Sequence, residues 1–171
     1  MLTEEYNDGI FWRSKEGEMI QNAEVQQLLG HWWFAYDNAI YDEWPQFFTA
    51  DVHFVCRTDT GATAFEEFVN ADVHGRDDVL AWQTQHRQGS PSPLRHGGEN
   101  IHISAERGDE VDFRSYIRVS QIVDGSPSNL STAIVEGTMR REDGQLRISA
   151  MTVILDTADS TVLGEGKAYW R

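Results

Sequence analysis

The sequence predicts an α+β fold in which N-terminal helices pack on one face of a strongly curved antiparallel sheet that encloses a pocket. Apolar residues recur with roughly helical spacing up to residue 88 and roughly alternate after it. Turn-forming sequences at 107–109, 124–127 and 143–144 separate the later runs. The 171 residues, 40% of them hydrophobic, match the length and core content of one domain.

The charge balance disfavours two classes of partner. Against 28 Asp and Glu residues stand 14 Lys and Arg, a net charge of −14, which disfavours binding to nucleic acids and to anionic membranes. No apolar run reaches about 18 residues and the first residues lack the cationic start of a signal peptide, so we expect a cytoplasmic protein. The single cysteine, Cys56, excludes an intramolecular disulfide and a cysteine-based metal cluster within one chain.

The first half of the chain predicts an arm followed by helices. We expect residues 1–21 to form an acidic N-terminal arm and residues 22–171 to form a single domain. A helix from Asn22, as N-cap, to about residue 40 follows from apolar residues three and four positions apart. These are Val25, Leu28, Leu29, Trp32, Tyr36, Ala39 and Ile40.

The remaining elements follow from shorter patterns. Residues 42–48 predict a short helix with Pro45 near its first turn, and 52–57 predict a strand. A helix over 75–87 ends at the Gly- and Pro-containing stretch that follows it. Alternation then predicts an antiparallel meander of four strands, at 100–104, 111–123, 130–141 and 146–155.

A sheet curled around the aromatic first helix creates a pocket, and polar residues that face it are candidates for chemistry. His96 begins the sheet half of the chain and precedes Gly97 and Gly98, which permit close approach of a ligand or a backbone. It is either a general acid or base, or a hydrogen-bonded structural histidine.

Tyr36 and Asp37 are adjacent in the first helix and point about 100° apart, so both can reach the rim of one cavity. A carboxylate there can orient an imidazole, or it can simply pair with Arg95. On the strand at 111–123, one charged face is expected to be solvated or part of an interface; it carries Asp112, Arg114, Tyr116 and Arg118.

Motifs for cofactors and metals are not found. The histidines at 31, 53, 74, 86, 96 and 102 show neither HxxxH nor HExxH spacing, so we expect no metal. The sequence also lacks GxGxxG, P-loop and GxSxG motifs, so a nucleotide cofactor and serine-hydrolase chemistry have no support. What remains is acid–base chemistry without a cofactor, or no catalysis at all.

The order of several motifs resembles the SnoaL-like branch of the NTF2-like superfamily over about residues 22–156. The motifs are Tyr36-Asp37 at the end of a Trp-rich helix, Asp42-Glu43-Trp44, the run from Phe48 to Phe54, and His74-Gly75-Arg76-Asp77-Asp78. This resemblance implies an α+β cone with an internal pocket. Members often use that pocket for cofactor-free dehydration, isomerisation, cyclisation or elimination.

Within that branch, the scytalone dehydratase type has a Tyr-Asp pair and a histidine that match Tyr36, Asp37 and His96. The resemblance implies that His96 moves a proton, Asp37 orients it, and Tyr36 polarises a substrate oxygen. It implies a lyase or isomerase acting on a small hydrophobic, aromatic molecule, including release of formaldehyde from an aromatic diol. Other residues of the family pattern differ, at Cys56, Gln121 and Ala133. The expected substrate-binding residues are Trp32, Trp33, Phe54, Cys56, Tyr116 and Gln121.

Two alternatives remain. The chain also resembles the β subunit of aromatic-ring-hydroxylating dioxygenases, through 42–44, 93–96, 111–121, 140–144 and 152–156. The resemblance then implies a larger Rieske α subunit as partner and structural roles for Arg95 and His96. A non-catalytic pocket for a small aromatic or steroid-like ligand is the third possibility. Both resemblances imply an oligomer, for the enzyme a homodimer or homotrimer.

Overall fold

The computed structural model describes residues 19–90, 92–157 and 160. Most of the expected N-terminal arm therefore lies outside the described residues. The helical elements are α1 (Asn22–Asp37), the 3₁₀ helix η1 (Tyr41–Phe47), α2 (Glu66–Val69) and α3 (Arg76–Gly89). The strands are β1 (Phe48–Thr58), β2 (Ala71–His74), β3 (Leu94–Arg107), β4 (Glu110–Val123), β5 (Ser126–Glu142) and β6 (Gln145–Leu155).

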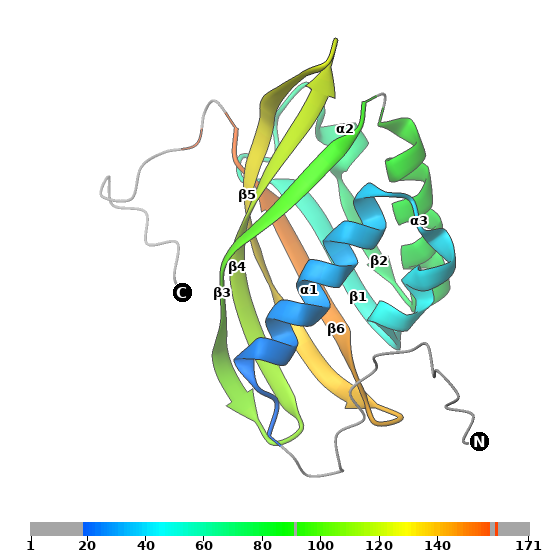
Figure 1. The fold of residues 1–171 in the computed structure, drawn as a ribbon, viewed down its shortest axis with the longest axis vertical. Helices are drawn as coiled ribbons and strands as arrows, with labels where there is room; N and C mark the ends of the chain where they lie inside the picture. The colour runs from blue at the N-terminus through cyan, green and yellow to red at the C-terminus, as the bar shows by residue number, and fades with distance from the viewer. Residues whose placement is uncertain (1–18, 91, 158–159, 161–171) are drawn as a thin grey trace, which may run out of the picture.

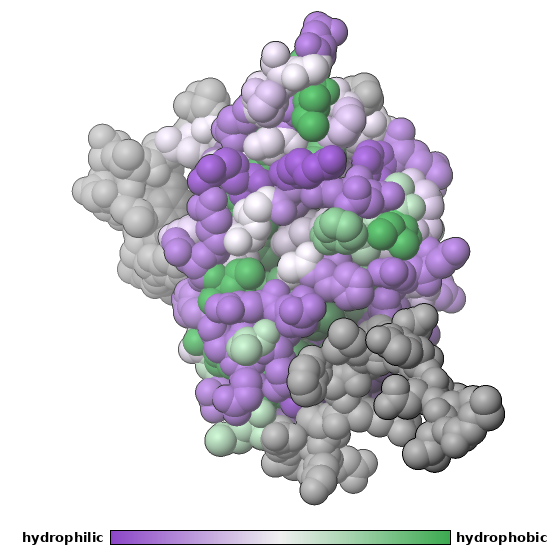
Figure 2. Space-filling view, in the orientation of Figure 1, coloured by the Kyte–Doolittle hydropathy of each residue, from purple (hydrophilic) through white to green (hydrophobic). Residues whose placement is uncertain are grey.

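The six strands form one curved sheet in the order β2-β1-β6-β5-β4-β3, with α1 and α3 on its inner side (Figure 1). The α+β fold with helices on a curved sheet is confirmed. One pair departs from the expected antiparallel pattern, because β1 runs parallel to β6. This pair joins the first long strand to the last strand of the meander. Most of the described surface seen in Figure 2 is hydrophilic, with scattered hydrophobic patches.

The first helix begins and ends slightly differently from the prediction. Its N-cap is Gln21 rather than Asn22, and the Gln21 backbone N–H donates to the Glu24 carboxylate at 2.9 Å. Asn22 instead accepts a hydrogen bond from the Ile103 backbone N–H at 3.1 Å, which ties α1 to β3. The helix stops at Asp37 because Ala39 adopts a left-handed conformation, with φ of 54°.

Two elements between residues 58 and 100 were not predicted, and a third begins earlier than expected. The short elements α2 and β2 interrupt a stretch whose composition gave no periodic signal. β3 starts at Leu94, six residues before the predicted strand, because glycines and a register shift between Glu99 and His102 obscure its alternation. This early start puts His96 on a paired strand next to the end of α1.

Trp32 lies at the centre of the aromatic core. It is fully buried and contacts the rings of its helix neighbour Tyr36 and of residues from η1 and β1, namely Trp44, Phe47 and Phe48. The contacts with Trp44, Phe47 and Phe48 are edge-to-face and pack α1 against η1 and β1. No helix among the described residues is long and apolar enough to cross a membrane.

Candidate active site

A cavity of about 410 Å³ opens between α1, α3 and the inner face of the sheet. Its volume lies in the range usual for sites that bind small molecules. The walls are mostly aromatic and aliphatic. Six of the residues expected at the site line it, namely Trp33, Tyr36, Phe54, Cys56, His96 and Gln121.

Asp37 and His96 form a buried pair at one end of this cavity. Asp37 is the last residue of α1, and His96 is the third residue of β3. One oxygen of the Asp37 carboxylate accepts a hydrogen bond of 2.6 Å from His96 Nδ1, and the other accepts one of 2.7 Å from the His96 backbone N–H. Only 6% of the Asp37 side chain and 10% of the His96 side chain are exposed.

These two hydrogen bonds determine which nitrogen of His96 is available. Because a carboxylate accepts only, the proton of the imidazole sits on Nδ1. Nε2 is then the ring nitrogen that a substrate in the cavity can meet. The bond to the backbone N–H also holds the start of β3 against the end of α1, so one carboxylate sets both the position and the tautomer of the ring.

The end of α1 is held by Arg87 from α3. Its guanidinium donates to the carbonyl oxygens of Tyr36, at 3.1 Å, and Asp37, at 2.9 Å. A cation there donates hydrogen bonds to the last carbonyl groups of the helix and interacts favourably with the negative end of the helix dipole. The considered pairing of Asp37 with Arg95 is wrong, because the Asp37 carboxylate binds His96 and Arg95 donates instead to the Leu94 carbonyl at 2.6 Å.

Trp33 forms the face against which the His96 ring lies. The two rings are stacked, with centroids 4.8 Å apart and planes 9° from parallel. Such stacking restrains the orientation of the imidazole ring. The Trp33 Nε1–H is buried and has no hydrogen-bond partner among the described residues, so this wall residue can offer a donor to a bound molecule.

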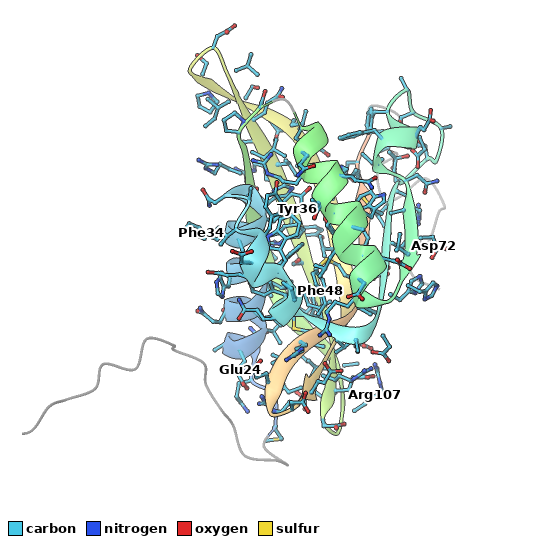
Figure 3. All side chains as sticks on the ribbon, turned by 90° about the vertical axis from the view of Figure 1, so that its right-hand side faces the viewer. Glu24, Phe34, Tyr36, Phe48, Asp72 and Arg107 are labelled. Carbon is cyan, nitrogen blue, oxygen red and sulfur yellow. The ribbon has the colours of Figure 1, made fainter. Side chains whose placement is uncertain are left out.

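A second histidine, which the sequence did not indicate, completes the site. The Tyr36 hydroxyl lies 2.6 Å from Nδ1 of His86, which α3 directs between the rings of Phe68 and Trp82. Figure 3 shows Tyr36 pointing from α1 towards α3, whereas Phe34 points away. His86 follows Trp82 by four residues on α3, and this spacing is the signal that could have revealed it.

Burial keeps both members of this pair neutral. Desolvation raises the pKa of Tyr36 well above its ordinary value. Burial, with smaller contributions from the charges of His96 and Arg87, lowers the pKa of His86 to about 4. A neutral phenol and a neutral imidazole carry two polar protons in total, and one of these lies in the hydrogen bond between Tyr36 and His86. The pair therefore presents a single hydrogen-bond donor, either the Tyr36 hydroxyl or Nε2–H of His86.

Two expected substrate-binding residues do not face the cavity. Trp32 is fully buried in the core, because its position on α1 is rotated about 100° from that of Trp33. Tyr116 is 52% exposed on the outer face of β4, whereas its alternating neighbours Ser115 and Ile117 are buried. Both residues are corrections to the predicted site.

The other expected wall residues lie where they were predicted, and their part in binding stays a prediction. Phe54 and Cys56 project inward from β1, and Gln121 lies near the end of β4. Burial raises the pKa of the Cys56 thiol to about 12, so this side chain is a small neutral wall residue rather than a nucleophile.

Comparison with solved structures shows the same fold. A protein from Novosphingobium aromaticivorans described as the β subunit of an aromatic-ring-hydroxylating dioxygenase has a TM-score of 0.64 and 16% identity, over 80% of this chain and 89% of that chain. An NTF2-like protein with a cystatin-like fold from the same organism has a TM-score of 0.63 and 17% identity, over 81% and 82%. A Catenulispora acidiphila protein, in complex with S-DNPA, has a TM-score of 0.64 and 21% identity, over 78% and 91%.

The sequence comparisons are consistent with this fold. Among curated proteins, none is significantly similar in sequence to this chain. A family model for the SnoaL-like domain matches residues 18–152, which include both α1 and nearly the whole sheet. The chain therefore belongs to the SnoaL-like domain family, within the NTF2-like fold.

Proposed function

We propose that this protein is a cofactor-independent lyase or isomerase that acts by acid–base catalysis on a small, largely apolar molecule with an aromatic ring and a carbonyl or phenolic oxygen. The observation that carries the proposal is the Asp37–His96 pair at an apolar cavity, with Nε2 of His96 left for substrate. Histidine held by a carboxylate is suited to moving a proton, a contribution worth about 10²–10⁴-fold in rate.

For an elimination, the proposed steps use only this chain's residues. Nε2 of His96 takes a proton from the carbon next to the substrate carbonyl, and the Asp37 carboxylate stabilises the imidazolium that forms. The electron pair of the broken C–H bond forms the new C=C bond as the C–O bond to the leaving hydroxyl breaks. His96 returns its proton to that oxygen, and water leaves.

The Tyr36–His86 pair supplies the second group that this reaction requires. Its single donor is positioned in the same cavity to bind the substrate oxygen on which negative charge develops. The role expected for Tyr36 is thereby shared with His86. The negative charge that develops on the substrate oxygen is stabilised by this donor. Because the pair is already desolvated and hydrogen-bonded internally, the site needs little reorganisation during the reaction.

Two probes test this proposal. Nitrobenzisoxazole reports a base in an apolar cavity, because removal of its ring C–H proton opens it to a coloured phenolate. A β-hydroxytetralone reports elimination, because loss of water yields a fluorescent naphthol. We expect wild type to accelerate both, and His96→Asn, which retains a donor for Asp37, to lose about 10²–10⁴-fold.

The matched control is His102→Asn, which replaces an exposed histidine elsewhere on β3 and should act like wild type. Turnover unchanged in His96→Asn would refute its role as base. A wild-type protein inactive on both probes would contradict the proposal that the cavity holds a working base.

The likeness to the protein described as a dioxygenase β subunit supports a second candidate. In that role the chain is a structural subunit of an aromatic-ring-hydroxylating dioxygenase, and the Asp37–His96 pair only joins α1 to β3. Native mass spectrometry of the untagged protein from its own cell extract distinguishes the two. A homo-oligomer that carries or accepts an aromatic ligand favours the enzyme, whereas a mixed assembly with a larger iron-containing chain favours the subunit.

A further inference from the structure

Three metal-ligating side chains meet on the outer face of the sheet edge, away from the cavity. His53 on β1 lies directly opposite His74 on β2, and Asp72 precedes His74 by two residues. Residues two apart on a strand share a face, so all three side chains project to the same side. The neighbours of His53 on β1, Val52 and Phe54, are buried on the inner face. Figure 3 shows Asp72 at this outer edge, away from Tyr36.

The donor atoms of the cluster already converge. His53 Nε2 lies 2.7 Å and His74 Nε2 lies 3.7 Å from the same oxygen of Asp72. One ligating atom from each of the three residues falls within 4.8 Å of the others. Ligand atoms that lie 2.0–2.1 Å from a tetrahedral Zn²⁺ are about 3.3 Å from one another. The two distances from the Asp72 oxygen to the histidine nitrogens, 2.7 and 3.7 Å, lie on either side of this value.

We propose that His53, Asp72 and His74 form a surface site for a divalent transition-metal ion, with Zn²⁺ the preferred occupant. Two imidazoles and one carboxylate are ligands that Zn²⁺ commonly takes, with the fourth position left to water. The two imidazole rings are stacked, with centroids 3.9 Å apart and planes 9° from parallel, so they must rotate for their lone pairs to meet at one ion. The exposure of these side chains, 41% for His53 and 71% for His74, allows that rotation.

A metal ion at this position cross-links the edge of the sheet. β2 pairs with β1 over only four residues, and it follows α2, whose Val69 lines the cavity. A bridge between the two strands would hold this part of the cavity wall in place. The geometry that supports the metal site does not depend on the proposed acid–base function, because its three ligands lie on the outer face of the sheet and none of them lines the cavity.

The spacing of the ligands explains why the sequence predicted no metal. His53 and His74 come from different strands, and their pairing depends on the register between β1 and β2. Motifs such as HxxxH detect ligands on one helix and miss ligands that meet across a sheet.

Calorimetric titration of ZnCl₂ into untagged, chelator-treated protein tests the site without any substrate. We expect saturation at one Zn²⁺ per chain and slower amide hydrogen exchange in β2 once the metal is bound. His53→Asn and His74→Asn should each weaken binding by more than the roughly 10–100-fold typical of losing an outer partner of a metal ligand.

His102→Asn is again the matched control, because it removes one exposed imidazole from another part of the surface. Circular dichroism of the metal-free variants checks folding, which exposed substitutions should leave unchanged. No saturable binding, or binding that survives in both His53→Asn and His74→Asn, would overturn the proposal. Equal loss in His102→Asn would do the same.

Discussion

Acidification should destabilise this protein through His86 before its carboxylates titrate. Burial lowers the pKa of His86 to about 4 in the folded protein, whereas an unfolded histidine titrates near 6.5. Between these values the unfolded chain takes up a proton that the native chain does not. The contribution of neutral His86 to stability is therefore fully present above about pH 6.5 and is lost as the pH falls towards 4.

The size of this loss follows from the difference between the two pKa values. Each pH unit below 6.5 costs about 1.4 kcal/mol until the folded pKa is approached, so about 1.4 kcal/mol is lost by about pH 5.5. That pH stays above the isoelectric point near 4.7, where the net charge vanishes and the chain would tend to aggregate. Urea unfolding at about pH 7.5 and about pH 5.5, monitored by tryptophan fluorescence, measures this loss of stability.

His86→Gln isolates the contribution of the imidazole. The amide keeps a polar partner for the Tyr36 hydroxyl but does not titrate, and all other groups cancel in the comparison. We expect wild type to lose about 1.4 kcal/mol more than His86→Gln between the two pH values. Parallel losses in the two proteins, or an NMR titration that places His86 near 6.5, would show that burial does not keep this imidazole neutral.

Two further predictions concern packing and reactivity. Gly137→Ala should lower the free energy of unfolding, measured by urea denaturation, by at least about 1–3 kcal/mol, because a Cβ there overlaps the rigid Ala150 carbonyl and lies 2.9 Å from Phe113. Gly30→Ala is the control, since a Cβ at that position meets open space, and equal stability of the two variants would contradict the packing argument. Cys56 should resist a disulfide reagent in the native protein at about pH 8 and react on unfolding, because its buried thiol stays protonated; rapid native labelling would count against this environment.

Local sequence patterns predicted the elements whose apolar periodicity is strong. α1 and the core of the meander followed from spacing alone, since one face of each is buried. The start of β3 was missed because Gly97 and Gly98 interrupt its alternation and Asn100 takes a φ of 55°. The parallel pairing of β1 with β6 joins distant segments, and neither strand's own sequence specifies which neighbour it takes.

The residues of the site show the same contrast: some positions follow from the local sequence pattern, whereas others depend on contacts between distant parts of the chain. Alternation along β4 already placed Tyr116 on the outer face, so its assignment to the pocket conflicted with the strand pattern. The choice between Trp32 and Trp33 as a wall residue depends on how α1 is rotated on the sheet, which periodicity specifies only roughly. His86 was missed because its role comes from Tyr36, fifty residues earlier.

The two histidines of the cavity differ because their partners differ. His96 has the Asp37 carboxylate, which stabilises the imidazolium formed when the ring takes a proton, whereas His86 has only the neutral Tyr36 hydroxyl and aromatic neighbours. Two histidines with such different hydrogen-bond partners are suited to different tasks. In the proposed reaction, His96 can therefore gain and lose a proton while the Tyr36–His86 pair stays a hydrogen-bond donor. In that reaction one apolar pocket supplies both the base and the neutral hydrogen-bond donor.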